Sequence, residues 1–338
     1  MVSFFEKAEK LMSQSDRETA RSASGSTSAG FEHKPVLVAE VLEALKPRSG
    51  GRYIDGTVGG AGHASRILAA SAPDGYLIGF DQDAMAMEAA QARLQAEFAG
   101  RFELHHANYS RAREFVAANS CDGALLDLGV SSPQLDRAER GFSFMAEGPL
   151  DMRQDQRQSE TAADIVNAWS ADEMARIFWE LGGERDSRRL ARVIERERQF
   201  RRIETTRQLA DVIERASPRH GRKSHPATKI FLALRMEVNQ ELPRLAEGLA
   251  ACWSALKMGG VLLVITFHSL EDRLVKDFGR ALTRDYDVIG EVDRPEFRKE
   301  RPAQARWVTK RAEPSESELA ENPRARSAQL RALEKLVS

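Results

Sequence analysis

A glycine-rich turn at residues 51–63 limits the fold of this chain more than any other stretch. Tyr53 and Ile54 are typical of the end of a buried strand, and Asp55 follows them directly. Four glycines come next, at Gly56, Gly59, Gly60 and Gly62. Glycine lets the backbone turn tightly and approach a ligand closely, and residues 63–70 have helix-forming composition. The sequence therefore predicts a strand–turn–helix unit that binds a nucleotide-like ligand at the edge of an α/β sheet.

The spacing of these glycines excludes two common phosphate-binding loops. Ser65 stands where the dinucleotide pattern requires its third glycine, and no Gly-Lys-Ser/Thr follows to make a P-loop. A second predicted strand, 76–81, ends in Asp81 about 25 residues after Asp55, where a ribose-binding acid belongs. Two strand-terminal acids on either side of a glycine turn favour an adenosyl site over a purely structural turn.

Strand and helix patterns alternate as far as Asp127, with further strands expected at 102–106 and 123–127, which indicates βαβ units and a parallel sheet. The next comparable strand is 259–267, about 130 residues later, although one crossover needs only about a dozen. Ser170 and Thr205 or Thr206 are plausible N-caps within this interval. Its expected helices are 162–169, 171–181, 188–198, 206–216 and 227–242. We predict a Rossmann-like α/β sheet with an inserted helical domain.

The predicted domains follow from this interruption. Residues 33–135 and 243–338 form the sheet domain, and residues 136–242 form the inserted helical domain. Segments 285–292 and 305–311 are expected to supply the last strands, before a polar tail that ends in a short Arg/Leu helix. Residues 1–32 are expected to be a flexible extension, because their Ser/Gly-rich composition cannot bury enough surface to order itself.

Charge is unevenly distributed along the chain. The formal net charge is -1, but residues 185–235 hold fifteen Lys/Arg against six Asp/Glu. Such an excess favours a polyanion as partner over an ordinary solvated surface. We expect RNA phosphates to contact mainly 185–202 and 219–229, with binding that weakens steeply as salt rises.

Cysteine use and hydropathy indicate the compartment. The chain has two cysteines, Cys121 and Cys252, in separate apolar surroundings, which suits buried thiols in a reducing compartment and gives no metal-ligand spacing. We find neither a signal-peptide pattern nor an apolar run of about 18 residues. A cytoplasmic protein without a membrane partner is expected.

The strand-terminal acids Asp55, Asp81 and Asp127 are expected to share one edge of the sheet, because parallel strands end at the same side. The Asp81 carboxylate can accept hydrogen bonds from both ribose hydroxyls. Gly62 and His63 would lie against the amino-acid end of a sulfonium cofactor. Asp127 would lie beside the reacting centre, and the segment 108–109 is placed to contact the adenine.

Several long motifs carry a resemblance to a known family. They are DGTVGGAGH (55–63), LLDLGVSSPQ (125–134), ERGFSFM (139–145), GPLDMR (148–153), HPAT (225–228), FHSLEDR (267–273) and ENPRARS (321–327). From about His33 to the C-terminus the chain resembles the bacterial ribosomal RNA small subunit methyltransferase H family. The resemblance implies a class I methyltransferase sheet. It also implies S-adenosylmethionine-dependent methylation of the exocyclic N4 of a decoding-site cytidine in 16S rRNA of the small ribosomal subunit.

The resemblance also implies a set of cofactor contacts. These are Ala61, Gly62, His63, Asp81, Tyr109, Asp127 and Gln134. The chain differs from the family at two of them, because Ala61 stands where glycine is frequent and Tyr109 where phenylalanine is common. Neither difference is expected to abolish binding.

The chemistry requires an acceptor for the cytosine amine. Cytosine N4 is a weak nucleophile because its lone pair is delocalised into the ring, so positioning supplies most of the rate. Asp127, Ser132 in the loop 131–133, and His268 are the candidates for a catalytic role. A structural role for His268 is the stronger interpretation by residue type alone.

The aromatic pair Phe142 and Phe144 has two interpretations. The rings could stack on a base that has left its neighbours, or they could clamp the two domains together.

Two other functions remain open at this point. A nicotinamide oxidoreductase would share the strand–glycine–strand–acid order, but the third glycine and a catalytic Tyr-Lys pair are missing. A non-catalytic RNA-binding protein would not need the intact glycine turn with Asp81 and Asp127.

Overall fold

The computed structural model describes residues 35–218, 225–288 and 294–337. These residues form two compact units, one from 130–241 and the other from the described parts of 34–129 and 242–338. We call the first the helical unit and the second the sheet unit. The predicted boundary at 135/136 lies a few residues inside the helical unit, and the predicted extension 1–32 lies outside the described residues.

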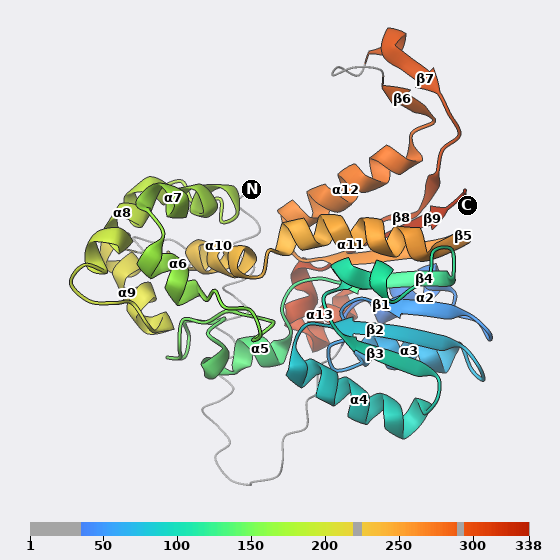
Figure 1. Cartoon of the computed structure of the whole chain (residues 1–338), viewed down its shortest axis with the longest axis horizontal. Helices are drawn as coiled ribbons and strands as arrows, with labels where there is room; N and C mark the ends of the chain where they lie inside the picture. The colour runs from blue at the N-terminus through green and yellow to red at the C-terminus, as the bar shows by residue number, and fades with distance from the viewer. Residues whose placement is uncertain (1–34, 219–224, 289–293, 338) are drawn as a thin grey trace. The chain divides into compact units, whose positions relative to one another are not determined.

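The sheet unit contains seven paired strands in the order β3-β2-β1-β4-β5-β9-β8 (Figure 1). Its parallel part consists of β1 (Arg52–Asp55), β2 (Tyr76–Asp81), β3 (Phe102–His106), β4 (Cys121–Asp127) and β5 (Leu256–Thr266). This parallel part confirms the predicted α/β class. It also places the carboxyl ends of β1, β2 and β4 side by side, because β1 pairs with both of its neighbours.

The far side of the sheet corrects the sequence interpretation of the C-terminus. Segment 329–335 is not a helix but the strand β9 (Gln329–Lys335), which lies antiparallel between β5 and β8 (Ala305–Ala312). Strand pairing on both sides overrides the helix-forming composition. The buried charge of Arg331 is compensated by Asp272, with 2.6 Å between Nε and Oδ1.

Helices cover both faces of the sheet (Figure 1). On one face, α2 (Val38–Leu45), α3 (Gly62–Ala70) and α4 (Ala84–Phe98) pack in one apolar core. On the other, α11 (Glu241–Ala255) and α12 (Ser269–Thr283) pack in a second core, which includes both cysteines. Cys121 and Cys252 are free and buried, as predicted.

The helical unit has a core of its own. Its helices are α5 (Ser132–Asp136), α6 (Ala162–Ala168), α7 (Ala171–Glu180), α8 (Ser187–Glu197), α9 (Thr206–Ala216) and α10 (Thr228–Val238). Ser170 and Thr205 are N-caps with capping boxes, which confirms the predicted starts of α7 and α9. The single helix predicted over 227–242 is wrong, because α10 ends at Val238 and Gln240 has φ +49°. The sequence analysis did not find α11.

A small antiparallel ribbon also corrects a predicted strand. Segment 286–288 forms β6 (Tyr286–Val288), which pairs with β7 (Arg298–Glu300) and not with the main sheet. Residues 289–292 of the predicted strand lie outside the described residues. In the described part of the chain, we find no helix with both the length and the apolar composition that a bilayer crossing requires.

Candidate active site

The turn between β1 and α3 brings the backbone close to neighbouring strands. Gly56 has no room for a side chain, because a Cβ atom there would meet Leu126 Cδ2 at 2.3 Å. Gly59 and Ala61 both adopt left-handed backbone conformations, with φ of +51° and +60°. Ala61 is fully buried and is the residue before the first turn of α3. Alanine is strained in this conformation and glycine is not.

Asp81, at the end of β2, holds the turn between β1 and α3 in place through hydrogen bonds. Its Oδ2 accepts a hydrogen bond from the Gly59 amide at 2.9 Å, and its Oδ1 accepts one from the Asp83 amide at 2.9 Å. Burial raises the pKa of Asp81 to about 6, although these amide donors lower it. Each carboxylate oxygen can accept a second hydrogen bond, so Asp81 can still accept from two ribose hydroxyls.

Asp55, His63 and Asp127 form a buried charged group between the ends of β1 and β4 and the first turn of α3. His63 Nε2 lies 3.5 Å from Asp127 Oδ2. The side chains of Asp55 and His63 are almost completely buried, and that of Asp127 is largely buried. We refer to these three residues together with Asp81 as the acid cluster. The structure thus brings together the three strand-end carboxylates that the sequence predicts at one edge.

The acid cluster has unusual protonation behaviour. Burial raises the pKa of Asp55 to about 7, and the nearby carboxylates Asp127 and Asp81 add to this effect against the opposing influence of His63. Burial lowers the pKa of His63, but Asp127 and Asp55 outweigh burial and the pKa is raised overall. His63 therefore favours the protonated form beside Asp127.

Several polar atoms of the acid cluster are buried without a hydrogen-bond partner in the described structure. They are Oδ2 of Asp55, Oδ1 of Asp127 and both ring nitrogens of His63, of which Nε2 has only the 3.5 Å ion-pair contact with Asp127. Such atoms destabilise a folded protein unless a ligand satisfies them. The two carboxylate oxygens are suited to a cationic group that donates hydrogen bonds.

Thr57 is a member of this site that the sequence analysis missed. Its Oγ1 accepts a hydrogen bond from the Asp127 amide at 2.7 Å, and its own amide donates to Asp55 Oδ1 at 3.2 Å. It therefore joins the ends of β1 and β4. The available signal was its place two residues after a strand-terminal aspartate, where an Asx-type turn is common.

Tyr109 follows β3 and packs into the core of the sheet unit. A Cβ atom on Gly248 of α11 would lie 2.2 Å from its ring, so the ring lies directly on the helix backbone. The side chain of the preceding Asn108 donates to Gln82 Oε1 at 2.9 Å, which links the segment to the end of β2. Tyr109 is only 8% exposed, and its contact with an adenine stays a prediction.

His268 has a structural contact in the sheet unit. It is the N-cap of α12, where its Nδ1 accepts from the Glu271 amide at 3.4 Å. Glu271 Oε1 lies 3.1 Å from His268 Nε2, and Oε2 accepts from the Phe267 amide at 2.9 Å. These contacts favour the structural interpretation of His268, and its catalytic role stays a prediction.

Ser132 and Gln134 belong to the helical unit. Ser132 begins the short helix α5, and Gln134 Oε1 accepts from the Ser131 amide at 3.0 Å in a capping box. The Gln134 side chain is buried. Their proposed catalytic and cofactor roles stay predictions.

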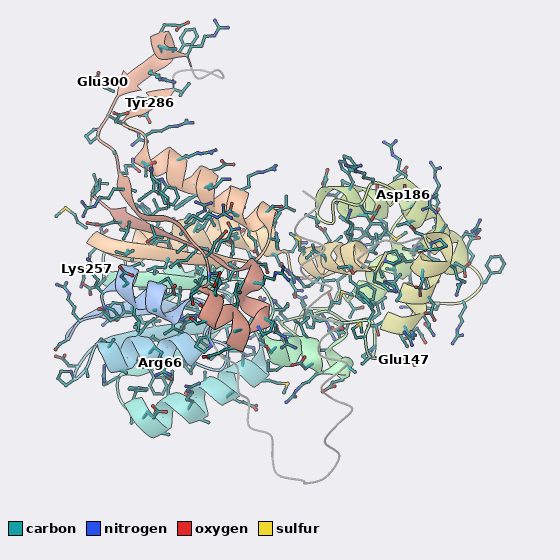
Figure 2. All side chains as sticks on the ribbon, turned by 180° about the vertical axis from the view of Figure 1, so that it is seen from behind. Arg66, Glu147, Asp186, Lys257, Tyr286 and Glu300 are labelled. Carbon is teal, nitrogen blue, oxygen red and sulfur yellow. The ribbon has the colours of Figure 1, made fainter. Side chains whose placement is uncertain are left out.

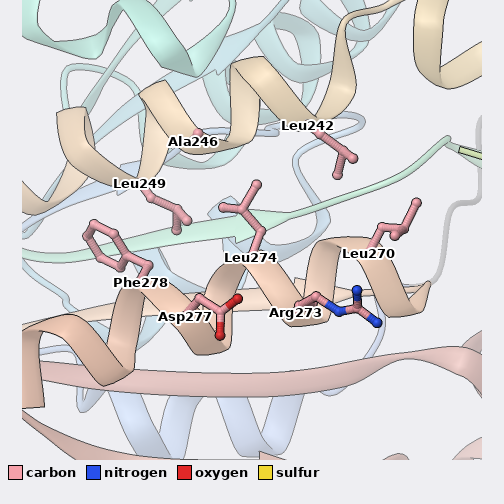
Figure 3. A pocket seen from close by; sticks show the side chains of 8 residues that line it. All are labelled: Leu242, Ala246, Leu249, Leu270, Arg273, Leu274, Asp277 and Phe278. Atoms are coloured by element: carbon pink, nitrogen blue, oxygen red, sulfur yellow. The ribbon is translucent and has the colours of Figure 1, made fainter. Parts of the chain in front are cut away.

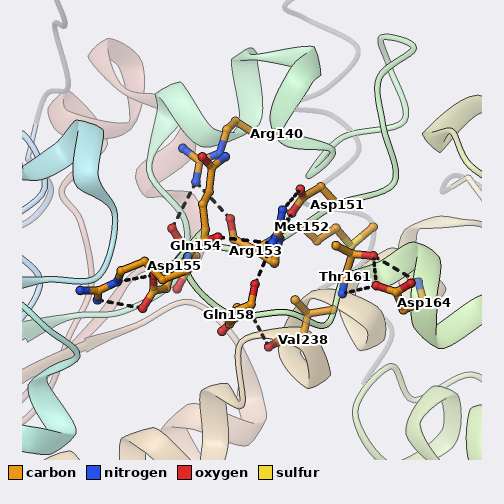
Figure 4. Close-up of polar contacts among 12 residues, drawn as sticks. Arg140, Asp151, Met152, Arg153, Gln154, Asp155, Gln158, Thr161, Asp164 and Val238 are labelled. Carbon is orange, nitrogen blue, oxygen red and sulfur yellow. Dashed lines mark hydrogen bonds and ion pairs between the residues drawn. The ribbon is translucent and has the colours of Figure 1, made fainter.

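Asn239, which falls within the helix predicted over 227–242, has a structural role at the end of α10. It is buried at the end of α10, where its Oδ1 accepts from the Gln154 amide and its Nδ2 donates to Met152 O, both at 2.8 Å. Figure 4 shows the segment that it holds, in which the Arg153 guanidinium pairs with Asp151 at 2.8 Å. Met152 adopts φ +64° and is fully buried. The motif at 148–153 is therefore a strained loop held by polar contacts.

The aromatic pair Phe142 and Phe144 lies in the core of the helical unit, and both rings are more than 90% buried. Phe144 packs edge-on against Phe231, with 4.9 Å between ring centroids. Burial leaves neither ring a face for a stacked base, so that prediction is wrong. The rings stabilise the helical unit from within, and a clamp between the domains stays a prediction.

A shallow apolar depression lies between α11 and α12 (Figure 3). Its volume is about 440 Å³, and its lining includes Leu242, Leu249, Leu274 and Phe278. Arg273 and Asp277 are its charged residues. No member of the acid cluster lines it, so we do not include it in the candidate active site.

The parallel sheet, the glycine turn and the acids at the ends of β1, β2 and β4 define a class of protein: an α/β enzyme with an adenosyl-cofactor site. Comparison with known proteins gives the family. The chain matches the MraW methylase family over residues 30–336, and it belongs to this family.

Individual relatives agree with this family. Ribosomal RNA small subunit methyltransferase H of Syntrophotalea carbinolica is 50% identical over 312 residues, covering 90% of this chain and 98% of the relative. The protein of the same name from Geobacter sulfurreducens is 49% identical over 319 residues, covering 90% and 99%. That from Citrifermentans bemidjiense is 48% identical over 319 residues, with the same coverage.

The family is one of S-adenosylmethionine-dependent methyltransferases, so the chain is an enzyme of this kind and the oxidoreductase interpretation is excluded. The acid cluster fits this cofactor chemically. S-adenosylmethionine carries a sulfonium, an α-ammonium group and a ribose diol, which are cationic or hydrogen-bond-donating groups. Buried carboxylate oxygens without donors are suited to such groups.

Proposed function

We propose that this chain methylates the exocyclic N4 of cytosine-1402 in 16S rRNA, within the small ribosomal subunit and in the cytoplasm. Two kinds of support carry the proposal. Relatives at 48–50% identity over nearly their whole length bear the name ribosomal RNA small subunit methyltransferase H. The acid cluster, with its unsatisfied buried oxygens, is the observation in this chain that best supports a cationic methyl donor.

The residues that hold the cofactor divide into two groups in this proposal. Asp81 accepts hydrogen bonds from the ribose hydroxyls, because both of its oxygens retain acceptor capacity. Asp55 and Asp127 face the cationic groups at the amino-acid end of the cofactor, and His63 lies against the same end. The backbone at Ala61 and Gly62 permits a close approach, and Tyr109 and Gln134 complete the contacts.

The bound cofactor supplies an activated methyl group. The chain must then hold the cytosine amine in line and accept one proton as N4 acquires its methyl group. We assign the acceptor to Asp127 Oδ1, which is buried and unsatisfied. His63 holds the other oxygen of the same carboxylate at 3.5 Å, so it orients Asp127 and stabilises its charge. Ser132 and His268 are the alternative acceptors.

The RNA partner is supported by the charge of the inserted segment. We propose that the helical domain, residues 136–242, recognises RNA through the basic stretches 185–202 and 219–229. Residues 219–224 lie outside the described residues. Phosphate contacts make binding salt-dependent, so methyl transfer to RNA fragments should slow steeply between low and physiological salt. Transfer that is indifferent to salt would contradict this assignment.

The deciding experiment identifies the methylated nucleoside. Small ribosomal subunits from a strain that lacks the corresponding methyltransferase are incubated with the protein and methyl-labelled S-adenosylmethionine, digested to nucleosides and separated. We expect the label in N4-methylated cytidine. Label at ring carbon C5, at a ribose 2′-hydroxyl or in protein would overturn the proposed function. Free rRNA and assembled subunits, tested in parallel, identify the preferred substrate.

A further inference from the structure

The arginines of the helical unit fall into two groups with different surroundings. Some are held by local partners: Arg198 donates to the carbonyls of Val166 and Trp169, and Arg189 pairs with Asp186 at 2.8 Å. Others are exposed and have neither an ion pair nor a hydrogen bond within the described residues. This second group includes Arg185, Arg188, Arg192 and Arg196.

The second group forms a row on one side of α8. Arg188, Arg192 and Arg196 are spaced by four residues, which places them on one face over about 12 Å of helix. Leu190, Ala191 and Ile194 occupy the opposite, buried face. The helix begins after Asp186, which is labelled in Figure 2. Arg185, which is also exposed, directly precedes the N-cap Asp186.

An ordinary solvated helix surface does not explain this row. Arginines at i and i+4 repel each other, whereas Glu–Arg pairs at the same spacing stabilise a helix. The helix α7 has such a pair, Arg176 with Glu180 at 3.2 Å. The row on α8 therefore destabilises its own helix, and a bound polyanion would remove the repulsion.

An aromatic side chain lies just beyond the row. Phe200 is 83% exposed and follows α8 in a turn where its amide donates to Glu197 O at 3.0 Å. Arg201 beside it is also exposed, and its guanidinium has neither an ion pair nor a hydrogen bond within the described residues. Exposed aromatic rings next to arginines are typical of surfaces that stack unpaired bases while the guanidiniums contact phosphates.

We propose that this arginine face, defined as Arg185, Arg188, Arg192, Arg196, Phe200 and Arg201, is the main surface of the helical unit that binds RNA backbone. Phe200 stacks on an unpaired base beside the contacted phosphates. The proposal rests on the proposed function, because it takes RNA as the substrate. The proposal narrows the predicted RNA-binding region from a basic stretch of about fifty residues to one side of α8 and the residues that flank this helix.

The test is the salt dependence of RNA binding, measured without cofactor by filter retention of a labelled rRNA fragment. The triple variant Arg188→Gln, Arg192→Gln, Arg196→Gln should lower the slope of log Kd against log salt by roughly 2 to 3, and weaken binding about a hundredfold at 0.1 M salt. The triple Arg→Lys variant should keep most of the slope. Phe200→Ala should weaken binding about tenfold without changing the slope.

A matched control removes the same charge from elsewhere in the helical unit. Arg176, Arg207 and Arg215 are exposed on α7 and α9, and their replacement by Gln should leave the slope nearly unchanged. An equal loss of slope in both triple variants would show that total charge matters and the arginine face does not. An unchanged slope in the α8 triple variant, with normal helix content by circular dichroism, would also overturn the proposal.

This outcome is separable from the proposed function. RNA binding is measured without methyl transfer, so the loss of slope can be seen even if the methylated nucleoside is not N4-methylcytidine. Conversely, N4-methylcytidine formation with normal RNA affinity in the α8 triple variant would keep the function and reject the arginine face.

Discussion

The acid cluster of the sheet unit and the arginine face of the helical unit contrast in charge, burial and internal pairing. The acid cluster holds three carboxylates around one histidine, largely hidden from solvent. The arginine face holds exposed guanidiniums that repel each other along α8. Each region is electrostatically unfavourable alone and is suited to a ligand of opposite charge. The difference matches two kinds of ligand. A small cationic cofactor suits a buried site, and an extended polyanion suits an exposed surface.

The largest effect is expected from removing the carboxylate of Asp127. Asp127→Ala should reduce methyl transfer at least about a thousandfold, because it removes the proposed proton acceptor and the partner of His63. Single-turnover transfer and cofactor affinity should be measured on the same preparation. If the variant lost cofactor affinity but kept its transfer rate at saturation, the catalytic role would pass to Ser132 or His268.

The helical unit depends on buried polar contacts to hold its shape. Asn239→Ala leaves the Gln154 amide and the Met152 carbonyl without their partner, so the free energy of unfolding should fall by about 2–4 kcal/mol. Urea denaturation followed by circular dichroism measures the change. Gln240→Ala alters a neighbouring exposed side chain and is the control. A loss below about 1 kcal/mol would mean that water satisfies the Gln154 amide and the Met152 carbonyl in the variant, and it would contradict this prediction.

The protonation of Asp55 should connect cofactor affinity to pH. Its pKa of about 7 lies above the ordinary value of 3.8, so the free folded protein holds a proton that the unfolded chain lacks between these values. Stability should therefore fall as pH rises through this range. A cationic cofactor favours the ionised carboxylate, so its affinity should rise between pH 6 and 8, by up to about tenfold per pH unit below the pKa.

Asp55→Asn should remove the part of this pH dependence that is centred near pH 7. The contribution of Asp81, with a pKa of about 6, should remain at lower pH. Titration calorimetry at several pH values makes the comparison. If cofactor affinity depends on pH in the same way in Asp55→Asn and in the unchanged protein, Asp55 does not bind the cationic end of the cofactor.

The smallest expected effect concerns backbone strain in the glycine turn. Ala61→Gly relieves the strain of a left-handed alanine at φ +60°, which should stabilise the folded state by about 1 kcal/mol. It also increases the conformational entropy of the unfolded chain, which stabilises the unfolded state by about 0.4–1 kcal/mol. Stability should therefore stay the same or increase by at most about 0.6 kcal/mol in thermal unfolding. A clear destabilisation would show that the Ala61 methyl group, which is fully buried, contributes packing that outweighs the strain.

Sequence reasoning found most of the acid cluster because the signals are local. A strand that ends in an acid and continues into a glycine turn places Asp55, Asp81 and Asp127 by chain order alone. The pairing of β1 with both β2 and β4 then brings them together. Thr57 was missed because its role depends on an amide of β4, a contact between segments that are distant in the sequence.

The errors have a common physical cause, which is tertiary context. Segment 329–335 has helical composition but becomes a strand because β5 and β8 pair with it on both sides. The end of α10 was not predicted because Asn239 accepts a hydrogen bond from the Gln154 amide, in a loop that is distant in the sequence. Phe142 and Phe144 have the composition of a base-stacking pair, and only the packing of α10 shows that they are core residues.

The most direct test of the account is a crossed measurement on two variants. Asp81→Asn and the α8 triple Arg→Gln variant are each assayed for S-adenosylmethionine affinity by calorimetry and for the salt slope of RNA binding. We predict that Asp81→Asn weakens cofactor binding about 10- to 100-fold with an unchanged RNA slope, because a charged acceptor of ribose hydroxyls is lost. The α8 triple variant should lower the salt slope of RNA binding and leave cofactor affinity unchanged. Equal effects of either variant on both ligands would contradict the separation of cofactor and RNA between the acid cluster and the arginine face.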